Sequence, residues 1–399
     1  MKKNNGLMKI LIFFPLLLFV LLVGWIGVSE WKENQGKRRP ASEAVSRESL
    51  TQSESESSQE TEVLTLENSN PQEEASGGKE EESLKPAAQL LFAGDILLSS
   101  HVTTAYDNVK GIDGILDEGY QGEISSADLF MANQEFPFSD RGSAAPDKQF
   151  TFRLSPSRVS MMNEIGVDIV TLANNHSLDY GTDALVDTCT ALNGAGIQFV
   201  GAGPDMGRAR QLVTKEVNGK TIGFLGASRV YPDTSWVANS KKPGMVSGYD
   251  PTILLEEVKK AEETCDYVVV YVHWGVERDE KPQEYQRALG KKIIDAGADL
   301  VIGSHPHVLQ GMEYYNGKPI CYSLGNFIFG SSIPKTALLR ANVDFDQGTT
   351  TLSLVPGTSG AGHTRMLTQA DDIQAFYQYY QGISFGVSVD ENGVIHNNN

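Results

Sequence analysis

The sequence predicts an α/β fold in which helices cover parallel or mixed β-sheets. From residue 88 onward, short apolar runs of strand length alternate with segments of helical spacing, the pattern expected of such sheets. Most of these runs end in a polar residue of a type that binds ligands. With 399 residues, 40% of them hydrophobic, the chain can also bury a large core. These observations favour a layered globular domain with a site at one sheet edge.

The apolar runs and helical segments can be placed in order along the chain. Ser155 is expected to cap a helix that has Pro156 at its first position. Beyond residue 330, strands at 349–355 and 385–389 and a helix at 371–380 are expected to complete or cover the sheet. The other predicted strands are 89–92, 129–132, 168–172, 198–200, 221–225, 267–272, 299–302 and 320–323, and the predicted helices are 155–165, 182–192, 252–264 and 282–296.

The beginning of the chain predicts a membrane anchor. Residues 10–28 carry no charge and form a run long enough to cross a bilayer as a transmembrane helix. Lysines in residues 1–9 favour a cytoplasmic tail, although basic residues on the other flank weaken that argument. So short a tail leaves the large domain as the translocated part, which predicts a single-pass protein of the cell membrane with its main domain extracellular. Cleavage after Ser29 is the alternative.

An acidic spacer separates this anchor from the globular part. Residues 29–86 are rich in Ser and Glu from Ala41 onward and have almost nothing to bury, so they are expected to be disordered. Residues 41–86 carry a net charge of −9 and residues 1–40 a net charge of +5, which leaves −14 of the total −18 for residues 87–399. So acidic a domain argues against a nucleic-acid partner. An anionic substrate would need a bound metal or a local basic patch.

Ligand-type side chains follow one predicted strand after another. In an open α/β sheet such strand ends share one edge, where these folds place their sites. Each residue alone has a simpler interpretation, such as a turn or helix cap for Asp95 and a hydrogen-bonded core histidine for His273. Their convergence favours a site. The residues concerned are Asp95, Asn133, Glu135, Asn174, Asn175, His176, His273, His305, His307 and Asn326.

This mixture of carboxylates, an amide oxygen and neutral imidazoles suits Mn, Fe or Zn better than calcium, which prefers oxygen ligands alone. Two such ions can clamp a phosphate and generate a hydroxide nucleophile near neutral pH. A histidine outside the metal shell, here His176, would protonate the leaving group. Asp179, three residues further on, could orient His176, or it could cap the following helix.

Six segments of the globular part stand out as motifs: Gly94-Asp95, Asn133-Gln134-Glu135, residues 173–181, His273-Trp274-Gly275, residues 303–307 and residues 323–327. Together they resemble the capsule-synthesis protein CapA family, which includes the poly-γ-glutamate biosynthesis proteins and is considered a branch of the calcineurin-like metallophosphatases. The resemblance covers about residues 88–330 in the family's order, and it implies a metallophosphatase-like layered sandwich over 87–330 with a C-terminal extension at 331–399.

The resemblance also implies a role for each site residue, including one or two divalent ions as cofactor. Leu97 departs from the superfamily pattern because a histidine normally stands there, so one metal position is expected to lack a ligand. By resemblance, Asp95 is the first metal-binding aspartate, Glu135 stands near the bridging carboxylate, Asn175 and His176 are the ligand and the acid, His273, His305 and His307 are later ligands, Asp179 assists His176, and Asn133, Asn174 and Asn326 support the site.

Two hypotheses of function follow. In the first, the chain is a metal-dependent, phosphoesterase-like hydrolase in the synthesis, export or retention of an anionic surface polymer such as poly-γ-glutamate. In the second, it is a non-catalytic subunit that binds the polymer beside membrane-bound synthesis proteins. Asn175 and His176 favour chemistry, whereas Leu97 favours binding.

Overall fold

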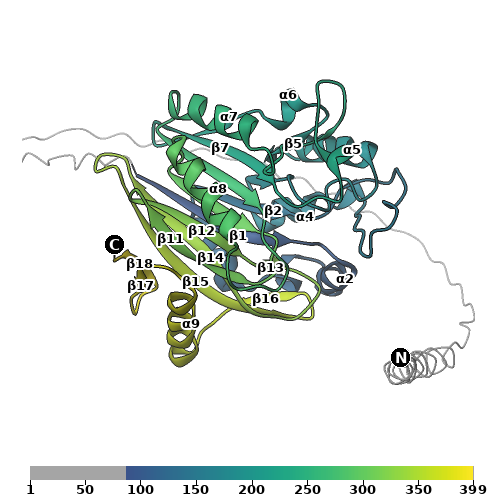
Figure 1. Ribbon diagram of the computed structural model, residues 1–399. Coiled ribbons are helices and arrows are strands. Elements are labelled where there is room, and N and C mark those ends of the chain that lie inside the picture. Colours follow the sequence, from purple (N-terminus) through teal and green to yellow (C-terminus); the bar gives the residue numbers. More distant parts are fainter. Residues whose placement is uncertain (1–86, 399) are drawn as a thin grey trace, which may run out of the picture. The chain divides into compact units, whose positions relative to one another are not determined.

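The computed structural model describes residues 87–398, so the predicted anchor at 10–28 and spacer at 29–86 lie outside the described residues. Within 87–398, no helix combines the length and the apolar character needed to cross a membrane. This part of the chain is a mixed α/β fold in which two sheets pack face to face and helices cover their outer sides (Figure 1). The predicted fold class, mixed sheets with covering helices, is therefore confirmed for the described residues.

The larger sheet has ten strands and is parallel on one side of its first strand and antiparallel on the other. Eight strands follow one path, while one short strand pairs with β1 and another with β15. In spatial order the path is β17 (Val387–Val389), β18 (Val394–Asn397), β15 (Thr349–Gly360), β14 (Ile333–Asp344), β1 (Ala87–Ile96), β2 (Leu129–Gln134), β3 (Ile169–Thr171) and β4 (Gln198–Val200), with β13 (Asn326–Ile328) on β1 and β16 (His363–Met366) on β15.

The second sheet has six strands, with a parallel centre and an antiparallel pair at each edge. A separate pair, β5 (Ala202–Gly203) and β8 (Gly244–Met245), lies in the loops. The order of the second sheet is β11 (Leu309–Tyr315), β12 (Lys318–Leu324), β10 (Leu300–Ser304), β9 (Tyr267–His273), β7 (Lys220–Ser228) and β6 (Val213–Val217).

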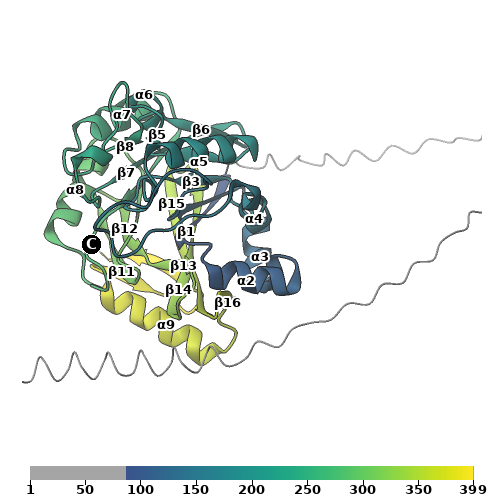
Figure 2. The same ribbon diagram turned by 90° about the vertical axis from the view of Figure 1, so that its right-hand side faces the viewer.

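The helices divide between the two outer faces (Figure 2). Four helices pack on the larger sheet: α2 (Ser100–Val109), α3 (Glu118–Ser126), α4 (Ser160–Ile165) and α5 (Thr182–Gly194). Two pack on the second sheet: α7 (Thr252–Glu262) and α8 (Glu284–Asp295). The remaining helices are the short α6 (Met206–Ala209) and α9 (Ala370–Ile383), and the 3-10 turns are Ile112–Gly114, Pro156–Arg158 and Thr234–Trp236.

The helix predicted at 155–165 is only partly correct. The structure has a 3-10 turn at Pro156–Arg158 and a separate α4 at Ser160–Ile165. The Ser155 hydroxyl does not cap the turn and instead lies 3.2 Å from a carboxylate oxygen of Asp140. Because that hydroxyl is used elsewhere, the capping interaction that the sequence pattern indicated does not form.

Alternation along the central strands explains their continuous apolar runs. In β1, Leu90 and Phe92 face the core between the sheets, whereas Leu91 faces the covering helices. In β9, Val269 faces the core between the sheets and Val270 the helices α7 and α8. A strand covered on both faces has no polar side, as is usual for parallel strands. Each such fully buried side chain contributes roughly 1.5–3 kcal/mol of stability.

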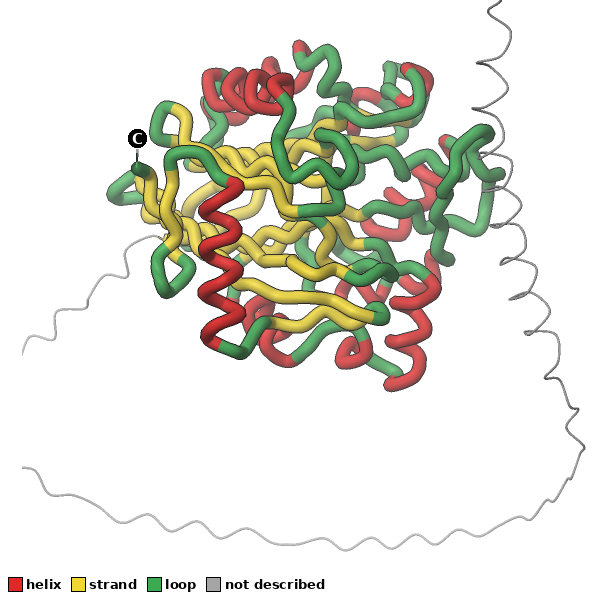
Figure 3. Tube along the Cα trace, turned by 60° about the horizontal axis from the view of Figure 1, so that its bottom comes forward, coloured by secondary structure: helices red, strands yellow, loops and turns green. Residues whose placement is uncertain are grey.

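Residues beyond 331 are integral to the larger sheet. They supply β14 to β18, and β14 pairs antiparallel with β1 along six residue pairs. Helix α9 crosses the strands (Figure 3). It buries Phe376, Tyr377 and Tyr380 in the core between the two sheets. This segment therefore closes the sandwich on the side away from α7.

Gly94 is where β1 approaches the turn between β12 and β13. The Asp95 amide donates to the Gly325 carbonyl at 2.8 Å, and a Cβ on Gly94 would lie 1.8 Å from that same oxygen. We expect Gly94→Ala to lower the free energy of unfolding of the full-length protein by roughly 1–3 kcal/mol or more, because the backbone at Gly325 must move to admit the new methyl group. Urea denaturation measures the change.

Gly194→Ala is the matched control. A Cβ on Gly194, the last residue of α5, would meet nothing within 4 Å, so this variant should be neutral or slightly stabilising, by up to about 1 kcal/mol. Equal stability of the two variants would show that the contact at Gly94 is not tight.

Candidate metal centre

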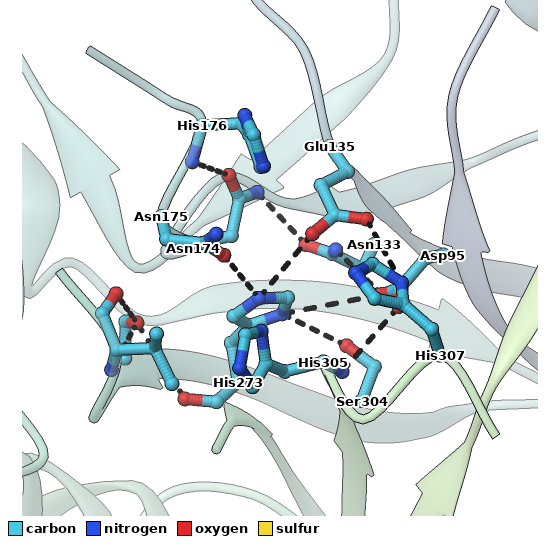
Figure 4. A network of polar contacts seen from close by, with 12 residues as sticks. Asp95, Asn133, Glu135, Asn174, Asn175, His176, His273, Ser304, His305 and His307 are labelled. Atoms are coloured by element: carbon cyan, nitrogen blue, oxygen red, sulfur yellow. Dashed lines mark hydrogen bonds and ion pairs between the residues drawn. The ribbon is translucent and has the colours of Figure 1, made fainter. Parts of the chain in front are cut away.

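The carboxyl ends of strands from both sheets meet at one edge, and they bring the predicted site residues together (Figure 4). Asp95 lies near the end of β1, and Glu135 follows β2 directly. Asn175 and His176 come from the loop after β3, and the remaining ligand candidates belong to the second sheet. His273 is the last residue of β9, and His305 and His307 follow β10. Because the strands of both sheets run toward this edge, residues far apart in sequence become neighbours.

Two groups of potential metal ligands share Glu135. In each group, the candidate ligand atoms lie within 4.8 Å of one another: one group is Asp95, Glu135 and His307, and the other is Glu135, His273 and His305. Asn175 adjoins the second group, since its Oδ1 lies 2.7 Å from Nε2 of His273. All six residues predicted as metal ligands therefore lie in one cluster with Glu135 at its centre.

Glu135 carries the strongest sign that a cation belongs here. Its side chain is fully buried, and neither carboxylate oxygen has a hydrogen-bond partner among the described residues. Its two oxygens lie 3.6 Å from Nε2 of His273 and 3.9 Å from Nδ1 of His307 (Figure 4). A buried carboxylate without hydrogen bonds is costly, and a cation between these donors would remove the cost. His305 likewise has a buried Nδ1 with no partner in this part of the chain, so the residues present fit a divalent metal.

The electrostatics of the cluster agree with this interpretation. Burial raises the pKa of Glu135 well above its usual value, and the nearby Asp95 adds to the effect. Burial lowers the pKa of His273 well below its usual value and that of His305 to about 4, so both imidazoles are neutral, as metal ligands must be. Burial also disfavours the charged form of His307, but attraction by Glu135 and Asp95 outweighs it and raises the pKa of His307 to about 10. A cation bound among these groups would take the place of the protons that Glu135 and His307 otherwise hold.

The loop that carries His305 and His307 is held in an unusual backbone conformation. His305 has a φ of 104° and His307 a φ of 59°, values that residues other than glycine rarely adopt. The His305 amide faces an Asp95 oxygen at 3.4 Å, and the Arg278 amide donates to the Pro306 carbonyl at 2.8 Å. Such strain persists only where the surroundings enforce it, and it is common at functional sites.

The three residues predicted to support the site form hydrogen bonds to it. The side-chain amide of Asn133 donates to Asp95 Oδ1 at 2.8 Å, and the side-chain amide of Asn174 donates to Asn133 Oδ1 at 2.9 Å. Asn326 Oδ1 lies 2.8 Å from His307 Nδ1. These bonds fix the orientation of the first and last ligand candidates.

His176 stands beside the cluster and belongs to neither ligand group. Its Nδ1 lies 2.7 Å from Asp179 Oδ2, so Nε2 is the nitrogen left for a ligand. Asp179 also accepts from the Phe152 amide at 2.7 Å, and Gly181 rather than Asp179 precedes α5 as its N-cap. The His176 ring borders a pocket of about 490 Å³ that Phe152 and His307 also line. Of the two roles considered for Asp179, the structure shows the contact with His176.

The part of the chain that holds this cluster matches a known protein family. The family described as "Bacterial capsule synthesis protein PGA_cap" matches residues 89–331. The chain belongs to this family. This match confirms the family resemblance seen in the sequence motifs. PGA_cap proteins form part of the metallophosphatase-like superfamily. All predicted site residues fall inside the matched range, whereas β14 to β18 and α9 lie beyond it.

Relatives in the PGA_cap family carry names from capsule and polyglutamate synthesis. The chain is 33% identical to the "Capsule biosynthesis protein CapA" of Bacillus anthracis, over 72% of either chain. It is 33% identical to the "PGA biosynthesis protein CapA" of Bacillus subtilis (strain 168), over 61% of this chain and 64% of that protein. Among solved structures, the NAD nucleotidase of Haemophilus influenzae aligns with 77% of this chain and 57% of that chain at 12% identity and a TM-score of 0.40, a likeness too weak to bear on activity.

Two residues that the motifs did not indicate also reach this cluster. The Glu277 carboxylate groups with His305 and His307 within 4.8 Å, on the exposed side of the cluster. The Lys148 ammonium contacts Asp179 and lies 3.0 Å from His176 Nδ1. Glu277 had a signal, since it follows the strand-end His273 by four residues. Lys148 had none, because a lysine between Asp147 and Gln149 is typical of a solvated loop.

Proposed function

We propose that this chain is a metal-dependent, phosphoesterase-like hydrolase that acts in the synthesis, export or retention of an anionic surface polymer of the poly-γ-glutamate type. The observation that carries the proposal is the buried Glu135, whose two unpartnered oxygens lie between two groups of ligand candidates. The printed names of the relatives, which concern capsule and PGA biosynthesis, support the choice of polymer.

Two divalent ions, of Mn, Fe or Zn, would occupy the site. Asp95, Glu135 and His307 would hold one ion, and Glu135 would share the second with three further donors. The three further donors are Asn175, His273 and His305. Bound there, the ions would clamp an anionic group of the substrate and supply a hydroxide nucleophile near neutral pH.

His176 would act on the leaving group. Since Nδ1 is engaged by Asp179, His176 can hold a proton at Nε2 and pass it to a leaving-group oxygen in the adjoining pocket. Burial lowers the pKa of His176, and the Asp179 carboxylate, which fixes the ring, partly opposes that shift. Phe152 lies against the other side, with ring centroids 4.4 Å apart, and keeps bulk water from that face.

We also propose that residues 10–28 anchor the chain in the cell membrane in a single pass, with the main domain outside the cell. The length of that uncharged run supports the anchor, and the short preceding tail supports the orientation. In this location the protein would work beside membrane-bound polymer synthesis proteins. A relative in Mycobacterium tuberculosis, 33% identical over 52% of this chain and 57% of that protein, is named a "probable polyglutamine synthesis accessory protein", which agrees with a role beside other components.

The alternative is a polymer-binding or assembly subunit without catalysis. Leu97 favours it, because this side chain stands where the superfamily has a metal-binding histidine and lies 3% exposed in the core under α2. A site with one ion fewer could still hold an anionic chain without activating water.

Hydrolysis assays separate the two functions. The purified full-length protein, loaded with Mn²⁺ or Zn²⁺, should hydrolyse 4-nitrophenyl phosphate or its diester, and chelation should abolish turnover. Bound metal without turnover on either ester would favour the polymer-binding subunit. Neither metal nor turnover after loading would rule out the metal-dependent hydrolase.

A further inference from the structure

Lys148 is a nearly buried lysine that no motif indicated. Its ammonium lies 3.0 Å from Nδ1 of His176. Its side chain is 14% exposed, although it comes from the long loop between β2 and the turn at Pro156–Arg158. The ammonium donates to Asp179 Oδ1 and to the carbonyl oxygen of Asn175. It also lies 5.2 Å from the centre of the Trp236 ring, which closes the other side.

The hydrogen-bond chemistry fixes the direction of each contact at Asp179, so the Lys148 ammonium and His176 Nδ1, which lie 3.0 Å apart, both donate to that carboxylate. A lysine ammonium only donates, and an ionised carboxylate only accepts. Asp179 therefore accepts from Lys148 on one oxygen and from His176 Nδ1 and the Phe152 amide on the other. With Asp179 fully buried, Lys148 is the cation that balances its charge.

Lys148 also connects His176 with the ligand shell. The carbonyl that it binds belongs to Asn175, whose side chain lies 2.7 Å from His273 Nε2. One ammonium thus holds the backbone of a ligand candidate and the carboxylate that orients its neighbour. Because both contacts come from a single group, losing it would loosen Asn175 and His176 together.

We propose that Lys148 is a positioning residue of this site: by binding Asp179 and the Asn175 carbonyl at once, it fixes the His176 ring relative to the donors from β9 and β10. The kinetic test of this proposal rests on the proposed hydrolase function, whereas a spectroscopic test does not. A residue with only a structural role would change stability without changing how the rate depends on the leaving group.

The kinetic test compares Lys148→Met with the full-length wild type on phenyl phosphate, a poor leaving group, and 4-nitrophenyl phosphate, a good one. If His176 protonates the leaving-group oxygen, a displaced His176 ring in Lys148→Met should lower kcat about 100-fold for phenyl phosphate. The loss should be much smaller for 4-nitrophenyl phosphate, whose leaving group needs little protonation. Lys220→Met removes a surface ion pair with Asp266 and should change neither rate. An equal loss on both substrates would overturn the positioning role.

The spectroscopic test works whether or not the protein turns over substrate. In protein labelled with ¹⁵N-histidine, the ring nitrogens of His176 can be assigned with His176→Gln. We expect the wild type to show Nδ1 protonated, and Lys148→Met to shift or broaden these signals while those of the exposed His396 stay unchanged. Unchanged His176 signals would show that Lys148 does not position the ring. An inactive wild type with the shift would contradict the hydrolase while supporting the role of Lys148.

Discussion

Replacing Glu135 with glutamine is expected to remove metal binding and turnover together while the chain stays folded. Glu135 is the residue shared by both ligand groups, so its loss takes a charged ligand from each ion. The affinity for metal should fall by more than the roughly 10- to 100-fold that changes outside the ligand shell cause. Metal analysis after desalting measures the loss, and hydrolysis of 4-nitrophenyl phosphate measures its consequence.

Thermal unfolding shows whether the effect of Glu135→Gln comes from metal or from the fold. Wild-type protein with metal at about 100 times its Kd should gain about 2.7 kcal/mol for each ion bound, and Glu135→Gln should gain almost nothing. Glu164→Gln is the matched control, because Glu164 is exposed and accepts a hydrogen bond from Tyr106 outside the site. Full metal content in Glu135→Gln would contradict the central position of this carboxylate.

A second pair of variants should separate a ligand from an acid. His305→Ala is expected to lose bound metal, since His305 belongs to a ligand group with Glu135 and His273. His176→Ala is expected to keep its metal and to lose turnover, by about 10² to 10⁴-fold on substrates with a poor leaving group, the usual contribution of general acid catalysis. Metal content and kcat are measured on the same preparations.

His396→Ala controls for loss of a histidine elsewhere. His396 is exposed and pairs with Asp390 at 3.0 Å in the C-terminal strands, so both readouts should match the wild type. Equal metal loss in the His176 and His305 variants would show that His176 is itself a ligand. The assignment of His176 as the acid of this site would then be wrong.

The parallel core could be predicted from the sequence because two-sided burial leaves a continuous apolar run. Residues 198–200 and 267–272 agree with β4 and β9 to within one residue. Strand β14 at Ile333–Asp344 was not predicted, because Pro334, Lys335 and Arg340 interrupt its pattern. Its position depends on antiparallel pairing with β1, about 250 residues earlier in the chain, and the local sequence does not predict so distant a pairing.

Some residues of the site could likewise be predicted from the sequence, and others could not. Its ligand candidates follow strands, and strand direction alone brings such residues to one edge. Lys148 and Glu277 reach the site from loops, whose paths depend on tertiary contacts such as that of Lys148 with Asp179. The left-handed backbone at His305 and His307 is also imposed by the surroundings rather than by residue type. Sequence therefore predicts the centre of the cluster and misses the groups that approach it from the side.

The measurement that tests the central claim most directly is the number of divalent ions bound by the full-length protein after loading with Mn²⁺ or Zn²⁺ and desalting. The arrangement of two ligand groups around Glu135 predicts two ions per chain in the wild type and close to none in Glu135→Gln. A wild type that binds no ion, or that binds the same number as Glu135→Gln, would contradict the claim that this cluster is a metal centre.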